Sequence, residues 1–329
     1  MKTLAERQTN MFCYNCGVAI KREHKFCFSC GTRLEFNVPE KNSQARIIVK
    51  SPDPASERSP EKNIFALEIL KTLDIKDLFK KMEATIKKEC SLSDEEFEQN
   101  WGRFKKYHYK NYLDNDIYWI LVQVAFYAGM KAATVTEKLP AIKKYFNDYD
   151  RAKYYSEIEV NSFLKDPNTI HYKRKIEACI NNAIRFDKLI KRYGTFSNYI
   201  ESFGNLQEDK TIEILKKDLM QFDYVGPITA YHVMLELGLN VWKPDRAICR
   251  ILFRLGLISD KDNINHAVLV GKEFSRQINE PIRYIDIIMV KYGQMGDEER
   301  FGLTNGGICL EKNPRCHVCG ISEYCAHHI

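Results

Sequence analysis

Apolar residues recur at three- and four-residue spacing from Ile64 to about Tyr292. This spacing places them on one face of an α-helix, and the region has no alternating run long enough to predict a useful β-strand. The first turns of the pattern show it clearly, with apolar side chains at Ile64, Leu67, Leu70 and Leu73. The sequence therefore predicts a core domain of the all-α class.

Polar residues mark several boundaries between the predicted helices. Ser93 and Glu96 have the spacing of a capping box just ahead of Phe97, in which each residue satisfies a free backbone group of the other. Gly194 followed by Thr195 is a helix stop followed by a helix start. The core is accordingly predicted as a bundle-like array of short helices without internal repeats.

The two ends of the chain differ from this helical region. Residues 1–34 contain a compact group of cysteines, and residues 35–63 are rich in proline, serine, lysine and glutamate, a composition typical of a flexible linker. We expect a helical domain over residues 64–300 and a second cysteine-rich loop over residues 301–329.

Composition and charge narrow the function only slightly. Hydrophobic residues make up 44% and charged residues 29% of the chain, and the net charge is +6. A mild positive charge permits binding to a polyanion but does not require it. No apolar run approaches the roughly 20 residues of a membrane helix, and the first ten residues do not resemble a signal peptide. We expect a cytoplasmic, monomeric protein that does not bind membranes.

The N-terminal cysteines form two CxxC pairs separated by ten residues, each followed by a glycine. Four thiolates at this spacing can close a tetrahedral zinc site, so we predict a zinc ribbon with the ligands Cys13, Cys16, Cys27 and Cys30. Such a ribbon can bind nucleic acid, bind protein or only stabilise its own fold, and the basic residues from Lys21 to Arg33 leave this choice open.

The C-terminal cysteines have the asymmetric spacing C-x6-C-x2-C-x5-C, formed by Cys309, Cys316, Cys319 and Cys325. With Pro314 ahead of Cys316, this loop resembles the iron-sulfur loop of endonuclease III and the related adenine glycosylases. The resemblance implies a [4Fe-4S] cluster with a structural and electrostatic role. A second four-cysteine zinc site is the alternative. The three other cysteines, Cys90, Cys179 and Cys249, stand among apolar residues and are predicted to lie in the core.

Two segments ahead of this loop resemble the helix-hairpin-helix DNA glycosylase superfamily. The first is Phe222-Asp-Tyr-Val-Gly-Pro-Ile-Thr-Ala-Tyr-His-Val233, whose Val225-Gly226 turn would present backbone N–H groups to a DNA phosphate. The second is Lys243-Pro-Asp245-Arg-Ala-Ile-Cys-Arg250, followed by Leu255-Gly-Leu257. The resemblance implies that Asp245 is the catalytic carboxylate. An ordinary helix cap is the alternative role, and one residue can serve both.

The central region resembles a second branch of the superfamily, 3-methyladenine DNA glycosylase I. The similarity lies in Tyr172–Ala178, Asn181–Ala183 and Tyr193–Tyr199, and again in the hairpin. Where that branch has an acidic residue that reads the base, this chain has Val124. Its zinc-binding termini are also missing, so the substrate of that branch does not carry over directly. We predict a base pocket formed by Gln123, Phe126 and Tyr127.

The resemblance also implies how the protein would contact DNA. Predicted contacts come from the hairpin and the loops near it: Val225, Gly226, Ile228, Thr229, Lys243, Arg246, Met130 and Lys131. Met130 is the predicted wedge that fills the gap left by an extruded base, although a methionine at a helix end also suits a core position. Ile228 occupies the position where the lyase branch has a lysine, so we expect a monofunctional enzyme.

These observations predict a monofunctional DNA glycosylase for base excision repair, acting on double-stranded DNA with an alkylated base and associated with the nucleoid. A mismatched, oxidised or hypermodified base is an alternative substrate. A non-catalytic DNA-binding protein of the same fold is a second alternative, but it has no need of a carboxylate at Asp245. A zinc-ribbon adaptor in transcription would explain only the first 34 residues.

Overall fold

The computed structural model describes residues 11–12, 19–20, 70, 72–109 and 112–327. Its helical elements, in chain order, are α2 Ile75–Glu89, α3 Asp94–Asn100, η1 Gly102–Lys106, α4 Asp114–Tyr127, α5 Ala132–Phe146, α6 Tyr149–Ala152, α7 Glu157–Lys165, α8 Lys173–Tyr193, α9 Phe196–Glu201, α10 Asp209–Leu219, α11 Pro227–Glu236, α12 Arg246–Arg254, α13 Ile264–Ile278, α14 Ile282–Gly293, η2 Glu299–Phe301, η3 Cys316–Val318 and η4 Ser322–Tyr324. Two short strands, β1 Met11–Phe12 and β2 Ala19–Ile20, pair antiparallel on either side of the first predicted cysteine pair. The all-α prediction for the core is confirmed.

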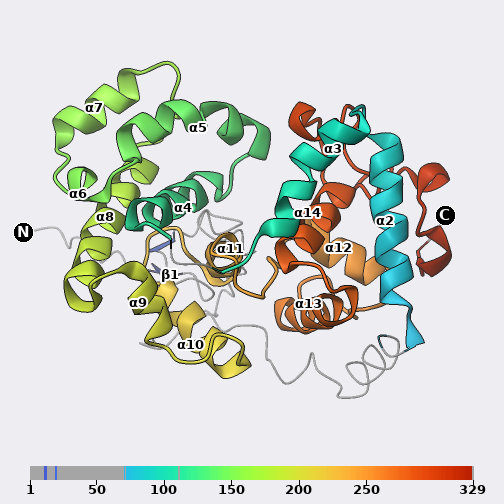
Figure 1. The fold of residues 1–329 in the computed structure, drawn as a ribbon. Coiled ribbons are helices and arrows are strands. Elements are labelled where there is room, and N and C mark those ends of the chain that lie inside the picture. The colour runs from blue at the N-terminus through green and yellow to red at the C-terminus, as the bar shows by residue number, and fades with distance from the viewer. Residues whose placement is uncertain (1–10, 13–18, 21–69, 71, 110–111, 328–329) are drawn as a thin grey trace, which may run out of the picture.

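The helices form two lobes (Figure 1). Helices α4 to α11 make the first lobe, while α2, α3 and α12 to α14 make the second, so the start and the end of the helical region pack together. Each lobe has its own cluster of buried apolar side chains. The fold thus creates a boundary between two separately packed bodies.

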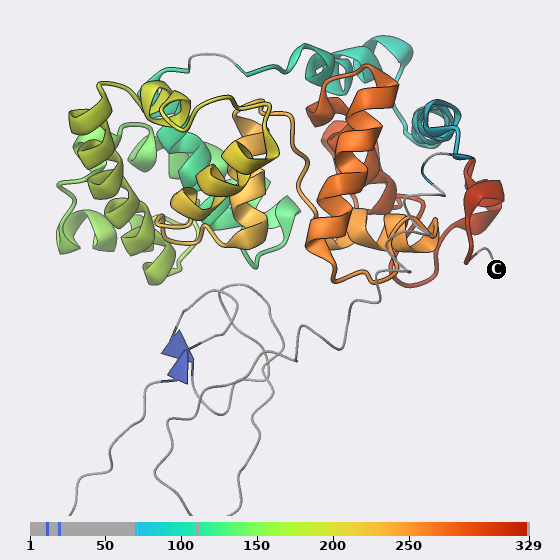
Figure 2. The same ribbon diagram turned by 90° about the horizontal axis from the view of Figure 1, so that it is seen from below.

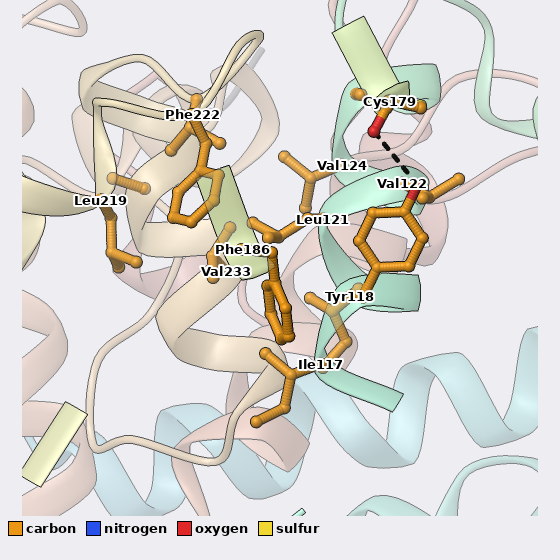
Figure 3. Packing of buried hydrophobic residues seen from close by; sticks show 14 of the residues in the cluster. Ile117, Tyr118, Leu121, Val122, Val124, Cys179, Phe186, Leu219, Phe222 and Val233 are labelled. Carbon is orange, nitrogen blue, oxygen red and sulfur yellow. Dashed lines mark hydrogen bonds between the residues drawn. The ribbon is translucent and has the colours of Figure 1, made fainter. Parts of the chain in front are cut away.

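The core of the first lobe is aromatic and apolar. In Figure 3, Tyr118 and Leu121 of α4 face Phe186 of α8 and the neighbouring helices, and the Tyr118 hydroxyl donates to the carbonyl of Cys179 at 3.0 Å. Phe186 stacks on Phe196 with ring centroids 4.6 Å apart and an interplanar angle of 5°. This packing fixes α4 and α8, the two helices that support the hairpin.

Helix α14 is the centre of the second lobe. It packs against α2, α12 and α13, and the 3-10 turn η1 also lies against it. Trp101 and Phe301 are buried beside it with ring centroids 4.7 Å apart. The N-terminal helices of the domain therefore complete a lobe made mainly from C-terminal sequence.

Two connections between the lobes include described residues, 107–109 with 112–113 in the first and 237–245 in the second. Figure 2 shows the described parts of both from below. They touch at Gly238, where an added Cβ atom would collide with the backbone of His108. Gly238 also has a φ of +80°, so both its conformation and this contact require glycine. The crossing segments bring Tyr107 and Asp245 to the lobe boundary.

Several local predictions are confirmed. Ser93 and Glu96 form the capping box of α3; Gly194 ends α8 with a φ of +84°, and Thr195 caps α9. Cys179 and Cys249 are buried, whereas Cys90 is only partly covered. No helix among the described residues is both long and apolar enough to cross a membrane. The linker, the start of the helical pattern at Ile64, and the N-terminal cysteines lie outside the described residues.

Candidate active site

Asp245 caps helix α12 at the lobe boundary. Its Oδ1 atom accepts hydrogen bonds from the backbone N–H groups of Ala247, at 2.9 Å, and Ile248, at 3.1 Å. Its Oδ2 atom lies 4.0 Å from Nζ of Lys243, and its side chain is 24% exposed. The cap therefore fixes the carboxylate through Oδ1 and leaves Oδ2 with Lys243 as its ionic partner among the described residues. Capping and a chemical role are compatible in this geometry.

A second carboxylate lies behind the loop that holds Asp245. Asp286 of α14 accepts from the backbone N–H of Lys243 at 3.2 Å and from the Arg283 guanidinium at 3.2 Å. Burial raises the pKa of Asp286 to about 7, although Arg283 acts against that shift. Asp286 thus ties the Asp245 loop to α14 and titrates near neutral pH.

Helix α11 adds two polar side chains at its C-terminal end. Glu236 receives a hydrogen bond from Arg283 at 2.7 Å, and His232 lies 3.5 Å from the same carboxylate. The Tyr107 hydroxyl donates to the Glu236 backbone carbonyl at 3.0 Å. The guanidinium of Arg283 in turn lies over the Phe104 ring, 4.9 Å from its centroid. These contacts join α11, α14 and the first crossing segment.

The charges of this group are set by burial and by mutual contact. Burial lowers the pKa of His232 to about 4, and the nearby Lys243 charge adds to the shift, so the imidazole is neutral at neutral pH. Burial alone would raise the pKa of Glu236, but Arg283 and His232 outweigh it and lower the pKa to about 2. Glu236 is therefore ionised across the physiological range. We call the six residues of this site the inter-lobe cluster: His232, Glu236, Lys243, Asp245, Arg283 and Asp286.

The predicted hairpin lies at the other end of α11. Gly226 is the N-cap residue, Pro227 occupies the first helical position, and the Thr229 hydroxyl accepts from the Gly226 N–H at 2.6 Å and donates to the Tyr224 carbonyl at 3.0 Å. An added Cβ at Gly226 would meet nothing closer than 3.8 Å. The backbone conformation and the packing at Gly226 would therefore both accept a larger residue. The absence of a side chain at this position leaves space in front of the helix N-terminus.

Helix α8 holds the hairpin in place. The Asn182 amide donates to the carbonyl of Asp223 at 3.0 Å and accepts from its N–H at 2.7 Å, and Arg185 pairs with its side chain at 2.7 Å. Asn182 is buried. This two-point contact with the backbone fixes where α11 begins and hence the direction of its first N–H groups.

The predicted base pocket is only partly at the lobe boundary. Tyr127 is half-buried, its hydroxyl pairs with Thr136 at 2.9 Å, and its ring centroid lies 6.4 Å from that of His232. Phe126, by contrast, is fully buried and stacks on Phe163 in the first lobe; its ring is not available to a base, because the α4 helical turn directs it into the core. Gln123 is half-buried, and Val124 points into the first core (Figure 3).

The loop after α4 carries the predicted wedge. Met130 is half-buried and packs against the first core, and Lys131 is exposed at the N-cap of α5. The ammonium of Lys175 fixes the start of this loop, since it donates to the carbonyls of Phe126 at 3.2 Å and Ala128 at 2.6 Å. The same ammonium lies over the Tyr224 ring, 4.4 Å from the centroid. Lys175 thus connects the loop to the hairpin.

A model of the methyladenine glycosylase family matches residues 88–241, a stretch that includes the hairpin and both polar side chains of α11. The central region of the chain is therefore similar to methyladenine glycosylases. Among solved structures, a 3-methyladenine DNA glycosylase I from Staphylococcus aureus is 22% identical, with 46% of this chain and 90% of that chain covered and a TM-score of 0.37. An endonuclease III trapped in a covalent complex with DNA is 16% identical, with 70% and 93% covered and a TM-score of 0.46.

The C-terminal loop of the chain carries four half-buried thiols that form no disulfide: Cys309, Cys316, Cys319 and Cys325. Arg254 of α12 donates to the Cys309 sulfur at 3.1 Å, and the Tyr292 hydroxyl lies 3.2 Å from the Cys319 sulfur. In the part of the chain that the structure describes, no group of three or more histidine, cysteine or acidic side chains is arranged to hold a metal ion. The donor chemistry nevertheless suits a thiolate-bound cluster.

Lys243 and Asp245 of this site were predicted from the sequence, whereas His232, Glu236, Arg283 and Asp286 were not. A signal for some of them was present. Asp286 interrupts the apolar run Ile285–Met289, and a carboxylate in such a run needs a buried partner. His232 and Glu236 are four residues apart and so share one face of α11. Arg246, a predicted DNA contact, is exposed on the first turn of α12.

Proposed function

We propose that this chain is a monofunctional DNA glycosylase of the helix-hairpin-helix superfamily, which uses Asp245 to hydrolyse the glycosidic bond of an alkylated base. The observation that carries the proposal is the position of this partly exposed carboxylate at the lobe boundary, where the α12 N-terminus binds Oδ1 but not Oδ2. Cleavage passes through a sugar with oxocarbenium character, which a nearby negative charge stabilises. The Oδ2 atom would then guide the attacking water.

The hairpin and the loop after α4 would hold the DNA during this step. The first N–H groups of α11 have no partner within the helix, and the open space at Gly226 admits a phosphate oxygen. Lys131, Arg246 and Lys243 supply positive charge at the same boundary. Phosphate contacts of this kind position a duplex without reading its sequence, while Met130 would fill the gap left by the extruded base.

Hydrolysis without strand cleavage is proposed because Ile228 stands in the hairpin where a Schiff-base lysine would be needed. The decisive test is incubation of the enzyme and an alkylated duplex with borohydride, followed by electrophoresis. We expect free base, an intact abasic strand and no covalent complex. A trapped complex would overturn the monofunctional assignment. Lys243→Met would then show whether Lys243, which lies 4.0 Å from Asp245, is the amine responsible.

The substrate assignment is tested with a panel of duplexes that each contain one altered base: alkylated, deaminated, oxidised or mismatched. Release of an alkylated base ahead of the others supports the proposal, and preference for another member would redirect it. Binding without release of any base would favour the second candidate, a DNA-binding protein of this fold. The partly exposed carboxylate of Asp245 is the feature that such a protein would not need.

The cysteine-rich ends are proposed to hold metal: a [4Fe-4S] cluster on Cys309, Cys316, Cys319 and Cys325, and zinc on Cys13, Cys16, Cys27 and Cys30. Support for the cluster comes from Arg254 and Tyr292, whose donors would offset the negative charge of bound thiolates. We expect a brown protein that contains both iron and zinc. Metal analysis that finds zinc alone, with no visible absorption, would contradict the iron-sulfur assignment.

A further inference from the structure

The carboxylate of Glu236 is only partly used by the protein. Its Oε1 atom receives Arg283 at 2.7 Å and has His232 at 3.5 Å. Its Oε2 atom has a single long contact with the Tyr107 hydroxyl at 3.5 Å, and the side chain is 23% exposed. A carboxylate oxygen can accept two hydrogen bonds. Oε2 therefore keeps capacity for a donor from outside the protein.

Two tyrosines lie near this carboxylate. The Tyr107 hydroxyl contacts Oε2, and the Tyr127 ring lies on the side of His232, with the two ring centroids 6.4 Å apart. The Tyr127 hydroxyl is directed to Thr136. Aromatic rings beside a carboxylate attract a flat group that is both stackable and positively charged. The arrangement thus differs from a plain ion pair between two helices.

The charge balance of the site also favours a cation. Lys243 pairs with Asp245, and Arg283 is shared between Glu236 and Asp286. His232 is neutral near pH 7 because burial lowers its pKa to about 4. When Asp286 is ionised, the inter-lobe cluster has three carboxylates and two cationic side chains. A positively charged ligand would complete this balance.

We propose, building on the glycosylase function above, that Glu236 determines specificity by accepting a hydrogen bond from a cationic base, a purine alkylated on a ring nitrogen. Such alkylation gives the base a positive charge while it is still attached to the sugar. The charge and the ring-edge N–H groups of the extruded base would meet Oε2, and its faces would meet the tyrosine rings. A neutral base of the same size would lack the electrostatic attraction to Glu236. This difference would let the site discriminate cationic from neutral bases.

The test compares Glu236→Gln with the unmodified protein on two duplexes, one with N7-methylguanine, which is cationic, and one with hypoxanthine, which is neutral. Glutamine keeps the size and an acceptor for Arg283. We expect the ratio of the two release rates to fall roughly ten- to a hundredfold, the value of a charge-assisted contact. The matched control is Glu273→Gln in α13, whose carboxylate is also half-buried beside an arginine; it should leave the ratio unchanged.

Equal slowing on both duplexes, with a lower melting temperature, would show that Glu236 only joins α11 to α14 and would overturn the proposal. A second measurement does not depend on catalysis: titration of the full chain with 7-methylguanosine and with guanosine at pH 6. We expect tighter binding of the cationic nucleoside, lost in Glu236→Gln. Selective binding of the cationic nucleoside without base release from any duplex would refute the proposed function but not the role of Glu236. Equal binding of the two nucleosides would refute the role of Glu236.

Discussion

The central helices of the two lobes bury different chemistry. Helix α4 of the first lobe buries apolar side chains, including Val124 and Phe126, while α14 of the second lobe buries Asp286 and Lys291. Each of these two ionisable groups has an ionic partner. At the boundary the first lobe contributes the hairpin helix α11 with Glu236, and the second contributes Arg283 and the loop that holds Asp245.

This difference suggests a division of work. The hairpin and the loop after α4 both belong to the first lobe and contact each other through Lys175. Asp245 belongs to the second lobe, where the α12 N-terminus and Asp286 orient it. Changes around Asp245 should therefore alter the rate of the chemical step, and changes in the hairpin should alter DNA affinity.

The largest effect is expected for Asp245→Asn. Asparagine caps a helix as well as aspartate does, so folding and DNA binding should be nearly unchanged, while loss of the charge should slow base release by roughly two or more orders of magnitude. Single-turnover rates at saturating enzyme measure the chemical step alone. The matched control is Asp74→Asn, another capping aspartate, at the start of α2. Full activity in Asp245→Asn would remove the catalytic assignment.

Asp286→Asn should slow base release by about tenfold, a smaller effect. The substitution removes one partly screened negative charge that would act on the reacting sugar. Protonated aspartic acid and asparagine are both neutral, so the two proteins should differ little below pH 6. As pH rises through about 7, the pKa to which burial raises Asp286, the wild type should gain activity over the variant. A pH–rate profile of kcat for both proteins tests this.

The same substitution has an opposite signature in stability. The pKa of Asp286 is about 7 in the folded protein, against an ordinary value of 3.8 for an aspartate in an unfolded chain, so the folded protein binds this proton more tightly. Its stabilising contribution is present below pH 3.8 and is lost as pH rises to about 7. The melting temperature of the wild type, relative to Asp286→Asn, should therefore fall over this range. A constant difference would show that Asp286 does not titrate there.

The contrast between the lobes also explains what could be predicted from the sequence. Hairpin and helix caps depend on neighbours within a few residues, so Gly226, Thr195 and the Ser93–Glu96 box could be identified from local patterns. Arg283, the partner of Glu236, lies in a helix about fifty residues further along the chain. Lys243, whose backbone N–H binds Asp286, lies in the second crossing segment. Side-chain direction settled the rest: Phe126 and Tyr127 are adjacent in sequence, but only Tyr127 faces the boundary.

In the first lobe, Thr229→Val should weaken DNA binding roughly three- to tenfold, the value of about one hydrogen bond, without changing the rate at saturation. The hydroxyl holds both Gly226 and Tyr224, so its loss loosens the turn that directs the α11 N–H groups toward a phosphate. Thr211→Val in α10 is a matched control, since that threonine is buried in a helix of the same lobe but lies away from the hairpin. Fluorescence anisotropy with an undamaged duplex measures the affinity.

Salt gives a second test of the first-lobe variant. If cationic side chains near the hairpin contact phosphates, affinity should fall steeply between low and moderate salt in the wild type, and the slope should stay nearly the same in Thr229→Val, because this substitution removes no positive charge. A slope that becomes shallower by about one unit would indicate that loosening the turn also moves a cationic side chain away from a phosphate. A change in single-turnover rate at saturation would contradict the division between lobes.

The smallest effect on chemistry is expected from deletion of residues 1–34. The predicted zinc ribbon is separated from the helical domain by a linker rich in proline and charge, so the inter-lobe cluster should be intact without it. DNA affinity should fall by about tenfold or less, because a tethered second site adds mainly effective concentration. The single-turnover rate at saturating DNA should remain that of the full chain. Loss of that rate would place the ribbon in the active site.

A double substitution, Cys13→Ser with Cys27→Ser, distinguishes two causes of weaker binding. It removes one predicted ligand from each knuckle but keeps the basic residues between Lys21 and Arg33. If this variant binds like the deletion, the folded ribbon is what contacts DNA; if it binds like the full chain, the positive charge of the segment is sufficient.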